Sequence, residues 1–154
     1  MTIVIGDNNI SSVYVGSKPV QKIYKGTDLI YEAYLPVGYE IFSISESLDM
    51  DNFATFTLPD LSKLKNGIRG ETFTWYDGEP TVQGGTFEVT KENLELLISG
   101  QDYYSQNGDG NGLLETMDNY GNAYNIERGG KIGENVIRVR PNGHGIGKLV
   151  ITAY

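Results

Sequence analysis

Residues 136–154 read VIRVRPNGHGIGKLVITAY, and this stretch decides the fold class. Apolar and polar side chains alternate over 136–140, and a second strand-forming run fills 148–154. A period of two is typical of half-buried β-strands. Three glycines (Gly143, Gly145 and Gly147) lie between the two runs, as they do in turns. The stretch predicts two strands joined by a hairpin turn, with the last strand built into a sheet.

The same alternation recurs further up the chain. It is found in 39–45, 54–58, 72–76 and 86–90, each rich in β-branched and aromatic residues. Composition agrees, because 20 glycines and 11 tyrosines in 154 residues favour many short strands and turns. The sequence therefore predicts an all-β protein of the β-sandwich or jelly-roll-like class.

One segment has the period of a helix. Residues 90–99 begin with Thr90, a good N-cap, and end before Gly100, which suits a left-handed C-terminal stop. Apolar residues recur at helical spacing at Leu94, Leu97 and Ile98. A single short helix at about 90–99 is predicted.

Charge and composition exclude several classes of function. Twelve basic and 20 acidic residues give a net charge of −8, which repels phosphate backbones, so no nucleic-acid partner is expected. The absence of Cys removes disulfides, thiolate nucleophiles and Cys-ligated zinc. No apolar stretch approaches the ~20 residues of a membrane span, and the start lacks the basic segment of a signal peptide. No membrane insertion is expected.

Charge also divides the chain in two. Residues 1–36 carry three lysines and three acidic residues, so the whole net charge belongs to 37–154. Pro36 and Gly38 mark a plausible junction. We therefore expect a β-meander module over 1–36 and a β-sandwich or jelly-roll-like domain over 37–154.

The first module contains a short internal sequence repeat. The run at 13–17 is repeated at 23–27, and a third strand-forming run follows at 29–34, which predicts a three-stranded meander from about 11 to 34. Some 35 residues bury too little surface to be stable alone. The meander must therefore contact the second domain, copies of itself or a partner through residues such as Val13, Tyr14, Val15, Ile23, Tyr24, Ile30 and Tyr31.

Residues 10–32 resemble a module common in tailed-phage structural proteins. The shared pattern is an aliphatic–Tyr strand and a Gly turn, then a V-x-K-I-Y-x-G strand (residues 20–26), then an L-I-Y-E strand (residues 29–32). The resemblance implies a non-enzymatic tail, baseplate, head-fibre or decoration subunit, assembled in the host cytoplasm and located in the virion. Its partners would be other virion structural proteins, and analogy with fibre and decoration proteins suggests a homo-oligomer such as a trimer.

A calcium loop can be fitted to residues 107–118. Oxygen-bearing residues stand at alternate positions, followed by Gly112 at the sharp turn, as in EF-hand and dockerin-type loops, which the segment resembles. The ligands would be Asn107, Asp109, Asn111, Glu115 and Asp118. Asn at the first position and Asp at the twelfth depart from that pattern, so only weak Ca2+ binding is expected. The alternative is a solvated loop with left-handed Asn and Gly residues.

Several aromatic residues are candidates for stacking on a sugar ring. They are Trp75 and Tyr76 in a predicted strand, and Tyr103 and Tyr104 beside an Asn-rich loop. They support an alternative function as a carbohydrate-binding module or host-receptor adhesin. A lone Trp in a strand more often belongs to the core, and the tyrosines are equally typical of a loop buried at a subunit contact.

Catalytic motifs are missing from the sequence. His144 is the single histidine, no G-x-S-x-G elbow accompanies it, and no phosphate-binding loop occurs. Twenty acidic residues offer many carboxylate pairs, but nothing selects one of them. The sequence favours a protein that is not an enzyme.

Overall fold

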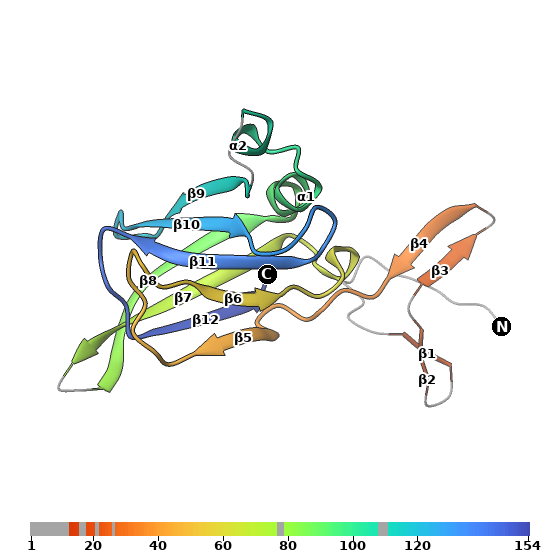
Figure 1. Cartoon of the computed structure of the whole chain (residues 1–154). Coiled ribbons are helices and arrows are strands. Elements are labelled where there is room, and N and C mark those ends of the chain that lie inside the picture. Colours follow the sequence, from red (N-terminus) through yellow and green to blue (C-terminus); the bar gives the residue numbers. More distant parts are fainter. Residues whose placement is uncertain (1–12, 16–17, 21, 26, 77–78, 108–110) are drawn as a thin grey trace.

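The structure is a computed structural model that describes residues 13–15, 18–20, 22–25, 27–76, 79–107 and 111–154. Most strands in these ranges belong to two antiparallel sheets packed face to face (Figure 1). The elements are β1 (Val13–Val15), β2 (Lys18–Val20), β3 (Lys22–Lys25), β4 (Asp28–Glu32), β5 (Glu40–Ile44), β6 (Ala54–Thr57), the 3-10 helix η1 (Leu61–Lys63), β7 (Gly67–Tyr76), β8 (Glu79–Thr90), α1 (Lys91–Ser99), α2 (Tyr103–Gln106), β9 (Leu113–Met117), β10 (Ala123–Arg128), β11 (Val136–Asn142) and β12 (Lys148–Ala153).

The sandwich consists of two four-stranded sheets. The first sheet has the order β6-β11-β10-β9 and the second β5-β12-β7-β8. The first strand of the sandwich therefore pairs with the last, and the second with the last but one. This arrangement confirms the predicted all-β sandwich class. No helix in the described ranges is long and apolar enough to cross a membrane.

The turn between β11 and β12 was predicted wrongly. The sequence suggested a hairpin, but the two strands lie in different sheets, and residues 143–147 cross between them. The crossing is held by two backbone hydrogen bonds between Leu48 and Ile146, both 2.9 Å, and by a 2.8 Å bond from the Gly147 N–H to the Phe73 carbonyl. β12 finds a neighbour on each side in β5 and β7, which a hairpin with β11 would have prevented.

Two aromatic stacks join the sheets through the core. Phe42 of β5 stacks on Phe56 of β6, and Phe87 of β8 stacks on Tyr124 of β10, each with ring centroids 4.6 Å apart. Gly70 stands opposite Phe87 in the ladder of β7 and β8 and leaves room for its ring. The fully buried aliphatic side chains around these stacks include Leu64, Ile68, Leu94, Leu97, Ile126, Ile137, Val139, Ile146, Leu149 and Ile151.

Helix α1 forms as the sequence predicted. The Thr90 hydroxyl accepts a hydrogen bond from the Asn93 N–H, and Gly100 ends the helix in the left-handed region at φ +70°. Its buried residues are Leu94, Leu97 and Ile98. They pack into the core described above, so the helix closes one part of the sandwich.

The N-terminal region differs from the predicted three-stranded meander. Its described residues form two separate hairpins, β1 with β2 and β3 with β4, beside the sandwich (Figure 1). The additional strand, β2, lies between the strand-forming runs at 13–17 and 23–27, where the sequence predicts a turn. The chain then meets the sandwich at Leu35, whose N–H donates to the Lys63 carbonyl at 2.8 Å and whose side chain packs on the core. Division of the chain near residue 36 stays a prediction.

The close approach of Gly70 to Phe87 predicts a measurable effect on stability. A β-carbon at position 70 would overlap the buried Phe87 ring, which is held in place by Tyr124. We expect Gly70→Ala to lower the free energy of unfolding by about 1–3 kcal/mol in chemical denaturation, the usual cost of overpacking.

Gly145→Ala is the matched control. A β-carbon there would meet its nearest neighbour, the Leu48 carbonyl oxygen, at 3.8 Å, which is ordinary contact. The control should unfold at the wild-type denaturant concentration. Equal stability of the two variants would contradict the packing assigned to Phe87.

Candidate functional site

The segment proposed as a calcium loop has a different conformation. Residues 113–117 form β9, which pairs with β10 along its length. An extended strand advances by about 3.3 Å per residue, so Glu115 and Asp118 are carried away from Asn107 instead of closing around one ion. Asp109 lies outside the described residues. The described part of the segment is therefore the C-cap of α2 and the strand β9, and weak Ca2+ binding stays a prediction.

Two other expected ligands, Asn107 and Asn111, form hydrogen bonds with other residues of the protein. Asn107 follows α2, and its side-chain amide donates to the Tyr103 carbonyl at 2.7 Å. The Asn111 carbonyl accepts a hydrogen bond from the Arg128 N–H at 3.1 Å. Within the described ranges, no group of three or more His, Asp or Glu side chains could hold a metal ion.

Asp118 organises the turn from β9 to β10. Its Oδ1 accepts hydrogen bonds from the N–H groups of Tyr120 and Asn122, both 2.9 Å. Its Oδ2 accepts from the Asn122 amide at 2.9 Å and the Tyr124 hydroxyl at 3.2 Å. Burial raises the pKa of Asp118, but these hydrogen bonds lower it by more than burial raises it. The pKa of Asp118 is therefore below its ordinary value. The charged carboxylate is the form that holds this turn.

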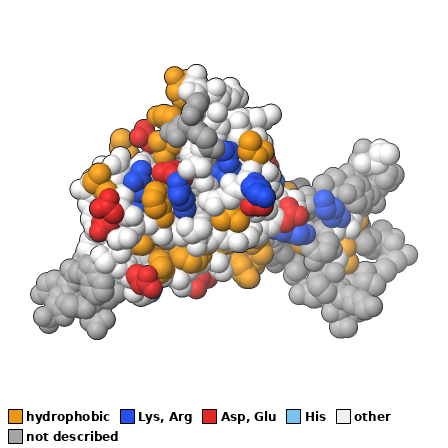
Figure 2. Space-filling model, viewed as in Figure 1, with side chains coloured by type: hydrophobic (Ala, Val, Ile, Leu, Met, Phe, Trp, Pro, Cys, Tyr) orange, Lys and Arg blue, Asp and Glu red, His pale blue; other side chains and the backbone are white. Residues whose placement is uncertain are grey.

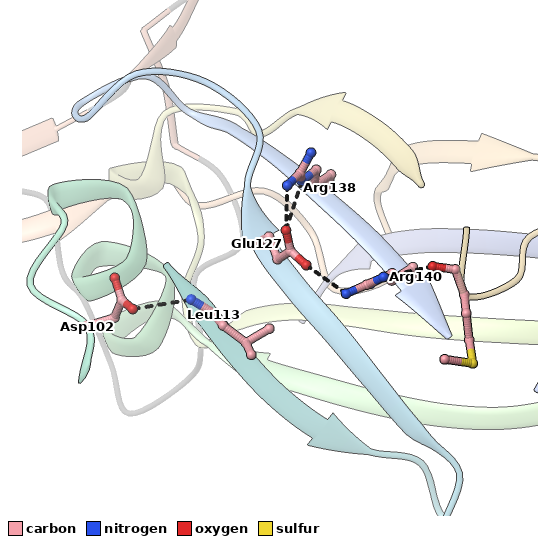
Figure 3. Close-up of polar contacts among 6 residues, drawn as sticks. Asp102, Leu113, Glu127, Arg138 and Arg140 are labelled. Atoms are coloured by element: carbon pink, nitrogen blue, oxygen red, sulfur yellow. Dashed lines mark hydrogen bonds and ion pairs between the residues drawn. The ribbon is translucent and has the colours of Figure 1, made fainter. Parts of the chain in front are cut away.

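Asp102 plays a comparable part at the other end of β9. The side chain is buried, and its Oδ1 accepts a hydrogen bond from the Ser105 N–H at 3.0 Å. The same oxygen accepts from the Leu113 N–H at 3.2 Å (Figure 3). Burial raises the pKa of Asp102, but the hydrogen bonds shift it below its ordinary value. Among the described residues, nothing donates to its buried Oδ2. Asp102 thus fastens α2, a helix that the sequence did not predict, to the start of β9.

Tyr124 belongs to a buried polar network. Its hydroxyl lies 3.2 Å from the Thr72 hydroxyl as well as from Asp118, and Thr72 exchanges two hydrogen bonds with the Gly85 backbone. The His144 ring meets the Tyr124 ring edge-on, with centroids 5.0 Å apart. The buried Nε2 of His144 has no partner among the described residues, so the histidine packs as part of the crossing between the sheets.

The aromatic candidates for sugar stacking lie on different elements. Trp75 and Tyr76 end β7, and their side chains fall outside what the structure describes. Tyr103 and Tyr104 lie in α2 with their rings edge-on, 5.4 Å between centroids, and Tyr103 is 72% exposed. α2 is fastened to β9 of the first sheet, whereas β7 belongs to the second sheet.

The predicted attachment residues all lie in the two N-terminal hairpins. Apart from the half-buried Ile23, their side chains fall outside the described set. The elements and residues are β1 with Val13, Tyr14 and Val15; β3 with Ile23 and Tyr24; and β4 with Ile30 and Tyr31.

A cluster that the sequence analysis missed lies on the outer face of the first sheet. Glu127 of β10 accepts two hydrogen bonds from Arg138 at its Oε2, from Nε at 3.0 Å and Nη2 at 2.6 Å. Its Oε1 lies 3.4 Å from Nη2 of Arg140, whose Nη1 donates to the Met50 carbonyl at 2.7 Å (Figure 3). Both guanidinium groups stand over the Phe53 ring, at 4.2 and 4.7 Å.

The cluster carries an excess of positive charge on an acidic protein. Glu127 is 11% exposed, whereas Arg138 and Arg140 are each 29% exposed, so the carboxylate lies beneath the two cations. Figure 2 shows basic and apolar side chains side by side on this face. The alternation of Arg138 and Arg140 with buried apolar residues was visible in the sequence, but their shared partner on β10 was not.

Comparison with known proteins adds no relative. The chain matched no protein-family model, no curated protein and no solved structure.

Asp118→Ala separates a structural role from calcium binding. Removal of the carboxylate leaves the backbone N–H groups of Tyr120 and Asn122, and the Asn122 side-chain amide, without their acceptor. We expect a loss of about 1–3 kcal/mol in the free energy of unfolding, the cost of unpaired buried groups. Thermal denaturation should show the same loss in calcium and in EDTA. The exposed Glu115→Ala is the control and should change little; a loss seen only in calcium would restore the metal site.

The raised pKa of Tyr124 predicts that the stability of the fold changes at alkaline pH. Burial, together with the neighbouring negative charge of Asp118, raises the pKa of Tyr124 from 10.0 to about 12. A raised pKa favours folding below pH 10, and this contribution is lost as pH rises through about 12. The ultraviolet difference between wild-type and Tyr124→Phe protein should therefore titrate near 12. A difference that titrates near pH 10 would show that the hydroxyl is solvated.

Proposed function

We propose that this protein is a non-enzymatic virion structural subunit of a tailed phage, of the accessory tail, baseplate, head-fibre or decoration type. Residues 1–36 attach it to other virion structural proteins, and the sandwich is the body that is carried. The virion assignment comes from the resemblance of residues 10–32 to the attachment module of such proteins.

The observation that carries the proposal is the position of the two N-terminal hairpins. In the described structure, β1–β2 and β3–β4 each form a two-stranded sheet of their own, and their strands join neither four-stranded sheet of the sandwich. An isolated two-stranded hairpin is marginally stable in water and needs a further surface to pack on. A neighbouring structural protein can supply that surface.

The stretch that follows the hairpins supports the same reading. Tyr34, Val37 and Tyr39 are exposed, with Val37 at 69%, although they flank the point at which the chain joins the core through Leu35. These apolar side chains would extend a contact surface from the hairpins onto the sandwich. We propose that the subunit works as a homo-oligomer, with a trimer as the first state to test by sedimentation.

Deletion of residues 1–32 tests the attachment. The truncation keeps Leu35 and its hydrogen bond to Lys63, so we expect the sandwich to retain a cooperative unfolding transition. We expect the truncated protein to be absent from purified particles, as measured by mass spectrometry. Normal occupancy of particles by a folded truncation would disprove the role of the hairpins.

A pair of point variants refines the test. Tyr39→Ser removes an exposed ring near the hairpins. Tyr120→Ser removes an even more exposed ring, in the turn between β9 and β10 at the other end of the sandwich (Figure 1). We expect the first to reduce incorporation and the second to leave it unchanged.

A carbohydrate-binding module or host-receptor adhesin is the second candidate function. The exposed Tyr103 ring, edge-on to Tyr104, is the feature that favours it. Loss of glycan retention by Tyr103→Ala, with unchanged incorporation into particles, would support this candidate over purely structural work.

A further inference from the structure

We propose that the outer face of the first sheet binds a carboxylated saccharide, such as a hexuronic acid unit of an acidic polysaccharide, with Arg138 as its carboxylate-binding residue. This surface is distinct from the attachment hairpins and from the tyrosine pair, so the inference rests on neither of them; it would add a saccharide site to either candidate function.

Arg138 is held ready to bind an anion. Its Nε and Nη2 are fixed on Glu127, and the Phe53 ring supports the flat side of the guanidinium. Its Nη1 donates to no described residue and is not a buried atom, so two N–H groups point to solvent from a rigid base. A guanidinium fixed in this way loses little entropy when it pairs with a carboxylate.

The charge of the cluster favours the same ligand. Arg138 and Arg140 share the one carboxylate of Glu127, which leaves one positive charge in excess. The remaining acceptor capacity of Glu127 is low, because both of its oxygens already face guanidinium groups. The cluster therefore offers donors outward, and its partner must be an acceptor or an anion.

Asn125 adds a second, independent sign of an incomplete site. It lies beside Arg140 in the ladder of β10 and β11 and is only 7% exposed. Among the described residues, the Asn125 Oδ1 and the Arg140 Nε are both buried and have no hydrogen-bond partner. The Asn125 amide nitrogen also has no described partner, but it is not buried. Unpaired polar groups at the centre of a face are costly unless a ligand or water completes them.

The surroundings select a sugar acid over a denser polyanion. Exposed Glu115 pairs with Asn125 across β9 and β10, and the exposed Thr55 pairs with Arg138 across β6 and β11. A negative charge beside the cluster disfavours closely spaced phosphates or carboxylates. Hydroxyl groups can donate to Glu115 and accept from the Asn125 amide, so a ligand with one carboxylate among several hydroxyls matches the accessible donors and acceptors of this face.

The chain offers a matched control for this site. Arg69 of β7 has the same local geometry on the second sheet: Nε and Nη2 reach one oxygen of Glu88 at 3.1 and 2.6 Å, and the Tyr154 ring lies 5.4 Å away. This pair has one cation for one carboxylate and so no excess charge. Arg69→Gln should leave binding unchanged, although it removes the same number of charges as Arg138→Gln.

The test is a calorimetric titration of the full chain with a short oligogalacturonate, compared with a neutral galacto-oligosaccharide and a short polyglutamate. We expect the oligogalacturonate to bind, and Arg138→Gln to weaken it about tenfold or more, as expected for the loss of a charge-assisted hydrogen bond. Neutral sugar and polyglutamate should bind at least about tenfold less tightly.

Nuclear magnetic resonance keeps the proposal testable if Arg138→Gln fails to fold. On adding oligogalacturonate to the wild-type protein, amide shifts should concentrate on β6, β9, β10 and β11. The proposal is overturned by absence of binding, by shifts concentrated elsewhere, by equal weakening in Arg69→Gln, or by equal affinity for polyglutamate, which would identify an acidic peptide as the partner.

Discussion

The contact between Phe87 and Tyr124 is the constraint on which the sandwich depends. The two rings belong to opposite sheets, and their stacking sets the separation of the sheets at that point. Gly70 makes the contact possible, because any side chain there would displace the Phe87 ring. Tyr124 also carries a hydroxyl into the core, so the same residue that joins the sheets has to be satisfied by polar neighbours.

Those polar neighbours explain the shape of the chain around β9 and β10. Asp118 accepts hydrogen bonds from the Tyr124 hydroxyl and from two N–H groups of the turn that follows it. These bonds fix where β10 begins. At the other end, Asp102 binds the Leu113 N–H and Arg128 binds the Leu97 carbonyl at the end of α1. Asp118, Asp102 and Arg128 complete backbone hydrogen bonding here, and the two carboxylates do not by themselves indicate a metal.

Two surfaces of the protein differ in chemical character. At the N-terminal end, hairpins that join neither sheet lead into the exposed Tyr34, Val37 and Tyr39. On the outer face of the first sheet, by contrast, Arg138 is fixed on Glu127, and its Nη1 donates to no residue that the structure describes. An apolar surface at one end and a polar, preorganised face along the side are compatible with a subunit that attaches through one and meets a ligand with the other.

The sequence by itself determined the period of most strands, the limits of α1 and the all-β class. These follow from local properties, since alternation marks a half-buried strand, and Thr90 and Gly100 satisfy the ends of a helix wherever it packs. The strand β10 could also have been found, because Tyr124 and Ile126 alternate with polar residues. It was hidden by the fit of the preceding residues to a calcium loop, which used the spacing of oxygen atoms without regard to β9.

Only the tertiary structure decided which strands are neighbours. Backbone hydrogen bonds are the same for every partner, so the alternation in 136–154 could not reveal that β11 and β12 lie in different sheets. For the same reason the sequence could not show that Glu127 pairs with both Arg138 and Arg140. That arrangement depends on the register of β10 with β11. Local chemistry specified the elements, and the register between distant strands created the charged face.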